Sequence, residues 1–560
     1  MHKQTSRGLV YLLTFLSLFA AACLCTGSNN VTNETDETTV EMPRNAAAIT
    51  IVATTSLQPW LENAIAQFNN AQNPVGDEQT AFVTLNSVEP GQAIADMTGG
   101  AELPVLWLPD SAVWTSILAD QGMNNYQSDC VSTAQSPLVI AMWREVAELF
   151  GWPNRSLGWL DVSGLAADPV AWEYYSGGQY GETLRLGHTH PGLSASGAST
   201  LLAIVQAAES QTEAISTDDI QQPSVQASVT AFESAVATFS PATAVLGQTM
   251  GERGTSYLSA AIVYESTVIQ YGNSQIVPIY PFEGTFMADF PACLNSSASE
   301  VDQEVAELFR DYLLSEPAQQ LALAAGLRPV NEAVTVGAPL DGVNGVDLSE
   351  PKVVFAAPTV ETVYAVQSLW QAARKPVNLV MLLDVSGSMA GSKMEGMRAA
   401  ALEFVEQMGE NDYLTIIAFA QQPVLVARYE KVGEAREILL NTIRGLVADG
   451  DTTLYDAIGL GSQVITETTT PQTTNAMVVL SDGVDTYSFN YSFGDQLLGL
   501  AAANDTTVFV IAYGSDADES VLQQFAAAGN GNFYQGDVAS IAAIYEEMSA
   551  VFGGTVGVGR

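Results

Sequence analysis

An aspartate and two serines stand two residues apart at the end of an apolar run, in the stretch "LLDVSGSMAG". They are Asp384, Ser386 and Ser388, and two more oxygen-bearing side chains follow, Thr452 in "GDTTLYDAI" and Asp482 in "VVLSDG". Carboxylate and hydroxyl oxygens, without thiol or imidazole, suit a hard cation. If the three loops meet, the five side chains predict a site for Mg²⁺, with Mn²⁺ and Ca²⁺ as the other candidates. The alternative is that they only form turns and caps.

The segments around these residues alternate between strand-like and helix-like patterns. "VNLVMLLDV" is an almost continuous apolar run, typical of a strand covered on both faces, and "DYLTIIAFA", "AMVVLSDG" and "TTVFVIAYG" are further strands. Between them, "KMEGMRAAALEFVEQM" and "REILLNTIRGL" have helical spacing. This alternation predicts an α/β fold with a doubly wound, mostly parallel, Rossmann-like sheet. Ligands of such sheets bind at the carboxyl ends of the central strands, where the oxygen-bearing loops are expected.

The five residues together resemble the metal-ion-dependent adhesion site of von Willebrand factor A domains, over residues 376–553. The resemblance implies that both carboxylates act largely through waters, so that the cation binds an Asp or Glu side chain of a partner protein. Thr453 adjoins Thr452, and the family spacing to "LYDA" favours Thr452. Asp451 and Asp485 add nearby negative charge, which either strengthens cation binding or is merely solvated.

The first part of the chain repeats the order of strand, hydroxyl-rich turn and helix. "AITIVATTS" passes into "PWLENAIAQFNNAQ", and "LPVLWLPDSAVW", "PLVIAMW" and "LGHTHPGLSASGASTLLAIVQAA" follow. This order predicts an α/β lobe with a ligand cleft at its strand ends. Thr54, Thr55 and Ser56 lie where a strand passes into a helix. They either cap the helix or turn their hydroxyls toward a bound polar ligand.

Several loose motifs, in order, resemble bacterial extracellular solute-binding proteins over residues 48–345. They include "VATTSLQPWL", "HPGLSASGASTLL", "IVYESTVI" and "IVPIYPFEGTFMADFP". The resemblance implies a two-lobed, periplasmic-binding-protein-like domain with a small-molecule solute held between its lobes. The cleft residues that it implies are Thr55, Ser56, Ser194, Ser196, Gly197, Glu265 and Ser266. Nothing among them dictates a solute, and a lobe pair that binds no small molecule is the alternative.

Histidine is scarce, which limits the chemistry open to this chain. His188 and His190 alternate, so they would lie on one face of a strand and could share a metal. No obvious third ligand lies nearby in sequence, so a pair that lines a loop is the preferred interpretation. The second domain contains no histidine, which excludes a Ser/His hydrolase there, and no P-loop, G-x-S-x-G or HExxH motif occurs. We therefore predict a binding protein and no enzyme.

The N-terminal residues predict export. Positively charged residues precede an apolar stretch, 8–22, which is too short for an ordinary membrane span and is typical of a signal peptide. "FAAAC" resembles a bacterial lipobox, which implies cleavage after residues 1–22 and acylation of Cys23. Secretion without a lipid anchor is the alternative. Residues 23–47 are polar and acidic, as in a flexible spacer.

Cysteine usage and charge narrow the class of protein further. Beyond the spacer only Cys130 and Cys293 remain, and two such cysteines either pair or stay free; export favours a disulfide. The chain has 62 acidic and 19 basic residues, a formal charge of -43. Such a charge repels nucleic acid and anionic membrane and favours cations, or it serves only solubility.

The expected boundaries are 48–345 for the first domain, 346–375 for a connector, 376–553 for the second domain and 554–560 for a tail.

Two functions therefore compete. In the first, a lipid-anchored protein on the extracellular side of the cytoplasmic membrane uses the cation of its second domain for adhesion or assembly with a protein partner. In the second, the chain is the substrate-binding receptor of a transport system, and the second domain is an accessory. We favour the first function.

Overall fold

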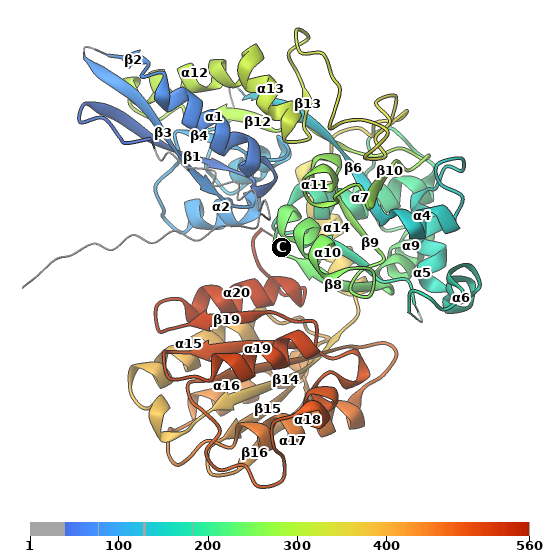
Figure 1. Ribbon diagram of the computed structural model, residues 1–560, viewed down its shortest axis with the longest axis vertical. Helices are drawn as coiled ribbons and strands as arrows, with labels where there is room; N and C mark the ends of the chain where they lie inside the picture. The colour runs from blue at the N-terminus through green and yellow to red at the C-terminus, as the bar shows by residue number, and fades with distance from the viewer. Residues whose placement is uncertain (1–39, 77, 127–129, 182, 559–560) are drawn as a thin grey trace, which may run out of the picture. The chain divides into compact units, whose positions relative to one another are not determined.

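The computed structural model describes residues 40–76, 78–126, 130–181 and 183–558 (Figure 1). The predicted signal peptide, Cys23 and most of the predicted spacer lie outside these residues. The described chain forms three β-sheets with helices packed against them. Every helix in these ranges is too short or too polar to span a membrane.

The first lobe is built on a six-stranded sheet of order β2-β3-β1-β4-β12-β5. Alternate residues of the first strand are buried, as its period-two apolar pattern predicts. The strands of this sheet are β1 (Ala46–Ala53), β2 (Pro74–Val75), β3 (Gln79–Ser87), β4 (Leu106–Leu108), β5 (Cys130–Ser132) and β12 (Pro291–Leu294). The helical segments packed around it are η1 (Thr55–Leu57), α1 (Gln58–Asn70), α2 (Pro90–Thr98), α3 (Val113–Asp120), α12 (Glu300–Leu313) and α13 (Glu316–Ala324).

The second lobe is built on a seven-stranded sheet whose main path is β10-β6-β9-β7-β8, with β11 and β13 also paired to β6. Its strands are β6 (Ala134–Trp143), β7 (Leu186–Thr189), β8 (Val236–Ser240), β9 (Ala260–Tyr264), β10 (Ile276–Ile279), β11 (Met287–Ala288) and β13 (Arg328–Pro329). Its helices are α4 (Arg144–Leu149), α5 (Trp159–Ala167), α6 (Pro169–Ser176), α7 (Ala195–Glu209), α8 (Thr217–Ile220), α9 (Pro223–Glu233), α10 (Thr243–Arg253) and α11 (Glu265–Tyr271).

The chain passes between these two sheets more than once. Only Thr133 separates β5 of the first sheet from β6 of the second, and Asp289 and Phe290 separate β11 from β12. Two short connections between the sheets form the hinge that is expected of a two-lobed domain. The predicted two-lobed architecture is therefore confirmed.

A disulfide joins two strands at the edge of the first sheet. Cys130 on β5 and Cys293 on β12 are directly opposite one another in the antiparallel register, and their sulfur atoms are bonded. The two cysteines are 163 residues apart in sequence. The bridge thus closes a loop that contains almost the whole second lobe.

The predicted connector, 346–375, contains a helix of its own. Helix α14 (Val360–Ala373) contacts α7, α8 and α9 of the second lobe. Thr359 caps its N-terminus by accepting a hydrogen bond from the Thr362 backbone N–H at 3.3 Å. Trp370 of this helix is buried in the hydrophobic cluster of the two lobes. Much of the connector is therefore part of the packed core of the first domain.

The second domain has a six-stranded sheet of order β16-β15-β14-β17-β18-β19. Its strands are β14 (Val377–Asp384), β15 (Tyr413–Phe419), β16 (Pro423–Lys431), β17 (Thr474–Ser481), β18 (Thr507–Tyr513) and β19 (Phe533–Gly536). Its helical segments are η2 (Gly387–Met389), α15 (Ser392–Gln407), α16 (Val432–Arg444), α17 (Leu454–Thr468), α18 (Asp495–Ala501), η3 (Ala503–Asp505), α19 (Glu519–Ala528) and α20 (Ile541–Val551).

Both faces of this sheet are covered by helices (Figure 1). Leu379, Met381 and Leu383 of β14 lie in one cluster with residues of α15, α16 and α20. Val380 and Leu382 lie in a second cluster with residues of α17, α18 and α19. The apolar run of β14 therefore serves two cores, and the predicted doubly wound, mostly parallel sheet is confirmed. The antiparallel edge strand β16 is an addition that we did not predict.

Candidate metal centre and solute cleft

The first loop of the candidate metal centre begins at the last residue of β14. Asp384 is fully buried, and its Oδ1 accepts a hydrogen bond from the Ser386 backbone N–H at 2.8 Å. Its Oδ2 accepts one from the Ser481 hydroxyl at 2.6 Å. Burial raises the pKa of the Asp384 carboxyl, and the charge of Asp482 adds to the rise. A bound cation would offset both the burial of the Asp384 carboxylate and its repulsion from Asp482.

The carboxylate from the end of β17 lies directly against this loop. The Ser388 hydroxyl donates a hydrogen bond to Asp482 Oδ1 at 2.7 Å. The Ser386 and Ser388 hydroxyl oxygens are 3.0 Å apart. Parallel strands β14 and β17 are neighbours in the sheet, so their carboxyl ends place these side chains together.

The third loop, before α17, is tied to the first. The Gly387 N–H donates to the Gly450 carbonyl at 2.9 Å. The hydroxyl of Thr452 lies 3.7 Å from the position that a Cβ on Gly483, the neighbour of Asp482, would occupy. The adjacent Thr453 has a buried hydroxyl without a hydrogen-bond partner among the described residues. Of the two threonines, Thr452 thus faces the loop that carries Asp482.

A lysine lies within the candidate metal centre. Lys393, in the first turn of α15, places its Nζ 2.6 Å from Asp482 Oδ2. The ammonium group of Lys393 thus already contacts one of the predicted ligands of the cation. The nearby donors are carboxylates and hydroxyls, which are the oxygen ligands that fit Mg²⁺. Among the described residues, no three His, Cys, Asp or Glu side chains form a cluster, so the hydroxyls are needed to complete the site.

The position of Lys393 gives a first prediction. A cation that enters the site must compete with the ammonium group for Asp482. We expect Lys393→Gln to bind Mg²⁺ about tenfold more tightly than the wild type, which corresponds to about 1.4 kcal/mol. Isothermal titration calorimetry measures both affinities. Lys431→Gln, which removes an exposed lysine on β16, is the matched control and should leave the affinity unchanged. An equal or weaker affinity of Lys393→Gln would contradict the competition.

The residues predicted for the solute cleft fall into two separate groups. In the first group, Thr55 donates a hydrogen bond to the Glu89 carboxylate, and the hydroxyls of Ser194 and Ser196 are 3.0 Å apart. Ser56 lies beside Thr55, and its buried hydroxyl has no partner among the described residues. These predicted residues therefore lie at the starts of helices that are rich in hydroxyl groups. The hydroxyls of Thr55, Ser194 and Ser196 already form hydrogen bonds with other side chains of the protein. Of the two alternatives for Thr54, Thr55 and Ser56, capping of the helix is not found among the described residues, because neither η1 nor α1 has a side-chain cap.

The second group, Glu265 and Ser266, has other hydrogen-bond partners. Glu265 accepts hydrogen bonds from Arg328 Nε at 2.8 Å and Nη2 at 2.6 Å, and a third from the Tyr280 hydroxyl. The Ser266 N–H donates to the Ser136 hydroxyl at 3.0 Å. Glu265, the first residue of α11, is fully buried, whereas its partner Arg328 is partly exposed, so the Glu265 carboxylate is engaged within the chain.

Gly197 has a packing role that is visible in the structure. A Cβ at this position would lie 2.3 Å from the Thr189 carbonyl oxygen. A glycine is therefore required for α7 to approach β7 this closely. The hydrogen-bond network of the first group includes residues that we did not predict, among them Glu89, Asp110, Thr243 and Tyr264. Asp110 comes two residues after the end of β4 in "LWLPDSAVW", and its position after a strand is the signal in the sequence that indicates it.

The two histidines do not share a site. His188 Nε2 is 3.0 Å from Glu233 Oε1, and its Nδ1 is 2.8 Å from the Thr189 carbonyl oxygen. His190 Nδ1 accepts a hydrogen bond from the Gly192 N–H at 3.0 Å, so the proton must be on Nε2, which lies 2.8 Å from the Gly554 carbonyl oxygen. Each ring is therefore fully engaged in its own hydrogen bonds.

His190 gives a prediction about pH. Burial lowers the pKa of its imidazole to about 3, and the nearby charge of Arg374 also lowers it. The unfolded chain binds a proton near the ordinary pKa of about 6.5, well before the folded chain does. The contribution of this ring to stability is therefore complete above pH 6.5 and is lost as the pH falls. Relative to His190→Gln, the wild type should lose about 1.4 kcal/mol per pH unit below that point, measured by urea unfolding. Parallel pH profiles of the two proteins would contradict this.

Two family models match the chain. The model described as bacterial extracellular solute-binding protein matches residues 49–328, which is half of the 560 residues. The model of the von Willebrand factor type A domain matches residues 378–547. The two matches follow one another in the order in which we predicted the two domains.

Curated relatives match the second domain over short lengths. The protein sll0103 of Synechocystis sp. (strain ATCC 27184 / PCC 6803 / Kazusa) is 30% identical over 162 residues, which are 28% of this chain and 37% of that protein. The inter-alpha-trypsin inhibitor heavy chain H3 of Mesocricetus auratus is 29% identical over 119 residues, 19% of this chain and 13% of that protein. The chain thus spans only 37% and 13% of the lengths of these relatives.

Two solved structures are similar to parts of the chain. The sulfate-binding protein SubI from Mycobacterium tuberculosis H37Rv has a TM-score of 0.37 and 17% identity, and the match covers 51% of this chain and 88% of that chain. The von Willebrand factor type A protein from Catenulispora acidiphila has a TM-score of 0.30 and 19% identity, and the match covers 32% of this chain and 43% of that chain. Similarity at this level of identity concerns the fold alone.

Proposed function

Because the chain belongs to the family of bacterial extracellular solute-binding proteins and also carries a von Willebrand factor type A domain, we propose that it is an exported protein that binds partner proteins through a divalent cation. The observation that supports this most is the contact between three loops at the candidate metal centre. Two of them follow strands β14 and β17, and the third connects α16 to α17. They bring two carboxylates and three hydroxyl groups to one edge of the second domain's sheet.

The proposed cation would be held by the hydroxyls of Ser386, Ser388 and Thr452 together with the carboxylates of Asp384 and Asp482. The two carboxylates neutralise at most two charges, and the hydroxyls neutralise none. When bound, the cation supplies an electrophilic centre that an Asp or Glu side chain of a partner can reach. Mg²⁺ commonly keeps several exchangeable waters, and a partner's carboxylate can replace one of them.

A library of random peptides displayed on phage tests this proposal, because it samples acidic and non-acidic ligands alike and needs no identified partner. The full chain is immobilised, the library is washed in Mg²⁺, and the bound phage are eluted with EDTA. We expect the eluted peptides to be enriched in Asp or Glu. A synthetic peptide should lose its binding when that acidic residue is replaced by Asn or Gln. The Asp384→Asn chain, panned in parallel, is the control and should yield no such enrichment. EDTA-insensitive binding, or enrichment without acidic residues, would contradict the proposal.

The proposed site of action is the extracellular side of the cytoplasmic membrane, with Cys23 as a lipid anchor. The lipobox-like "FAAAC" supports this, and the polar spacer after it would hold the folded domains away from the bilayer. Mass spectrometry of the mature protein should show an acylated Cys23 as its first residue. Release of a Cys23→Ser chain into the medium is the expected companion result, and an unmodified mature N-terminus would contradict the anchor.

A further inference from the structure

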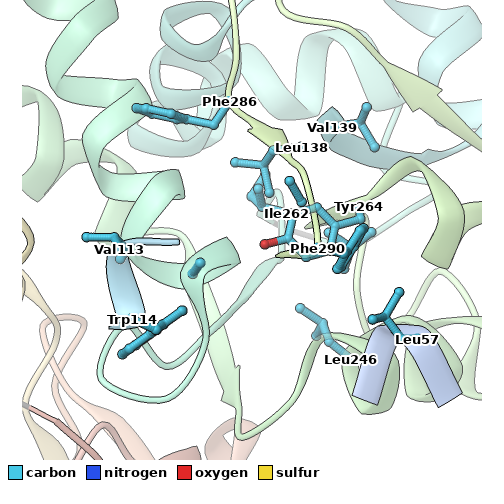
Figure 2. Packing of buried hydrophobic residues seen from close by; sticks show 14 of the residues in the cluster. Leu57, Val113, Trp114, Leu138, Val139, Leu246, Ile262, Tyr264, Phe286 and Phe290 are labelled. Carbon is cyan, nitrogen blue, oxygen red and sulfur yellow. The ribbon is translucent and has the colours of Figure 1, made fainter. Parts of the chain in front are cut away.

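The Asp110 carboxylate lies between the two lobes of the first domain, fully buried. Its Oδ1 accepts a hydrogen bond from Trp114 Nε1 at 2.9 Å. Its Oδ2 accepts from the Tyr264 hydroxyl at 2.8 Å, from the Ala195 backbone N–H at 3.1 Å and from the Ser194 hydroxyl at 3.2 Å. Figure 2 shows Trp114 and Tyr264 within the buried cluster that the two lobes share.

The donors around Asp110 come from both lobes. Asp110 follows β4 of the first sheet, whereas Tyr264 is the last residue of β9 in the second sheet. Ser194 and Ala195 form the N-terminus of α7, a helix of 15 residues. A helix N-terminus with a capping hydroxyl favours an anion, because its backbone N–H groups point outward and its dipole is positive there. Here the anion that occupies this position is part of the chain.

The hydroxyls next to this carboxylate bond to one another. Ser196 Oγ is 2.7 Å from Thr243 Oγ1 and 2.7 Å from Thr189 Oγ1, and Ser194 Oγ is 3.1 Å from Thr243 Oγ1. None of these four residues exposes its side chain to solvent. A solute would have to break this network to use the same hydroxyls.

A second carboxylate occupies the first-lobe side of the cleft. Glu89 is buried and accepts hydrogen bonds from Thr54 and Thr55. Burial, with the neighbouring charge of Asp110, raises the pKa of Glu89 to about 8, and hydrogen bonds from Thr55 and Ser194 offset only part of the rise. Burial also raises the pKa of Asp110, so both carboxyl groups of the pair favour the neutral form more than exposed carboxyl groups do.

The two lobes are also in direct backbone contact beside this pair. The Gly91 N–H, in the first turn of α2, donates to the Leu193 carbonyl at 2.8 Å. A Cβ on Gly91 would lie 2.0 Å from the Gly192 carbonyl oxygen, so only glycine permits this approach. The position between the helix starts is thus filled by the chain's own atoms.

We propose that Asp110 is an internal ligand, whose carboxylate occupies the anion-binding position between the two lobes, holds them closed and keeps anionic solutes out. The first domain is then closed to solutes. If the Asp110 side chain were removed, the vacated position would take a small carboxylate or a tetrahedral oxyanion. This inference concerns the first domain and is independent of the cation proposed for the second.

Chemical rescue of Asp110→Gly tests the proposal with formate as the probe, because formate restores the missing carboxylate. Thermal unfolding of the full chain is followed in formate or sulfate, against chloride at equal ionic strength. We expect Asp110→Gly to unfold several degrees below the wild type and to regain stability saturably with formate. The wild type should respond equally to all three anions. Asp168→Gly is the matched control. Asp168 also accepts from backbone N–H groups, at the start of α6, but it is exposed, so no saturable rescue is expected.

Two results would overturn the proposal. The first is saturable binding of sulfate, phosphate or formate to the wild type, measured by isothermal titration calorimetry, because the position would then be open to solutes. The second is an Asp110→Gly chain that is as stable as the wild type and indifferent to formate. If Asp110→Gly does not fold, refolding it in formate replaces the melting experiment: recovery of folded protein in formate but not in chloride supports the proposal, and equal recovery in both overturns it.

Discussion

Asp384→Asn should reduce the affinity of the chain for Mg²⁺ by at least about 100-fold and leave the fold intact. Loss of a residue that only supports a metal ligand commonly lowers the affinity for the metal about 10–100-fold. Asp384 is itself a predicted ligand and supplies a negative charge to the site, so we expect a larger loss. The fold should persist because burial raises the pKa of this carboxyl, so its negative charge is unfavourable in the metal-free protein. The amide keeps the shape of the side chain and an oxygen that accepts from Ser386.

Calorimetry with Mg²⁺ and thermal unfolding without it, on the same preparation, separate the two effects. Asp311→Asn removes a carboxylate from an exposed position on α12 of the first lobe and is the control for the change in net charge. The control should bind Mg²⁺ like the wild type. Unchanged affinity of Asp384→Asn would remove this residue from the site, whereas a collapse of its melting temperature in EDTA would mean that Asp384 serves the fold.

Replacement of both cysteines, Cys130→Ser with Cys293→Ser, should lower the free energy of unfolding of the first domain by about 5 kcal/mol in the chain-entropy model. The large value follows from the length of the closed loop, since the two residues are 163 apart in sequence. The measurement is the urea midpoint of the transition assigned to the first domain, recorded for wild type and variant under oxidising conditions.

The same experiment in a reducing agent supplies the control. Reductant should lower the midpoint of the wild type to that of the double variant and should not affect the variant itself. Equal midpoints for the oxidised wild type and the double variant would contradict the predicted contribution of the bridge.

The proximity of four of the five candidate metal-site residues could be predicted from sequence because Asp384, Ser386, Ser388 and Asp482 lie at or just after the ends of strands. Once β14 and β17 are neighbours in a parallel sheet, Asp384 and Asp482 must meet at one edge, and the fixed spacing of Ser386 and Ser388 places their hydroxyls beside them. Lys393 was not predicted. Its approach to Asp482 depends on the direction in which α15 leaves the loop, which the spacing of residues does not reveal.

The solute cleft could be predicted only in part, for a similar reason. Helix starts rich in hydroxyls identify Ser194 and Ser196, which are buried, and Thr55, which is partly buried. What their hydroxyls bind depends on side chains far away in sequence. Arg328 on β13 pairs with Glu265 and so takes its carboxylate out of the cleft. Asp110 comes from the first lobe and enters the cleft, where it accepts a hydrogen bond from Ser194. Pairings of this kind are decided by tertiary packing.

In the proposed function, the loops after β14, before α17 and after β17 hold a divalent cation. Anomalous X-ray diffraction from crystals of the full chain grown with Mn²⁺ tests it most directly, because Mn²⁺ scatters anomalously and accepts the same oxygen ligands. We predict a single strong peak within bonding distance of the Ser386 and Ser388 hydroxyls, with the Lys393 ammonium displaced from Asp482. A Lys393–Asp482 ion pair that persists at saturating Mn²⁺, with no peak between these loops, would contradict the account.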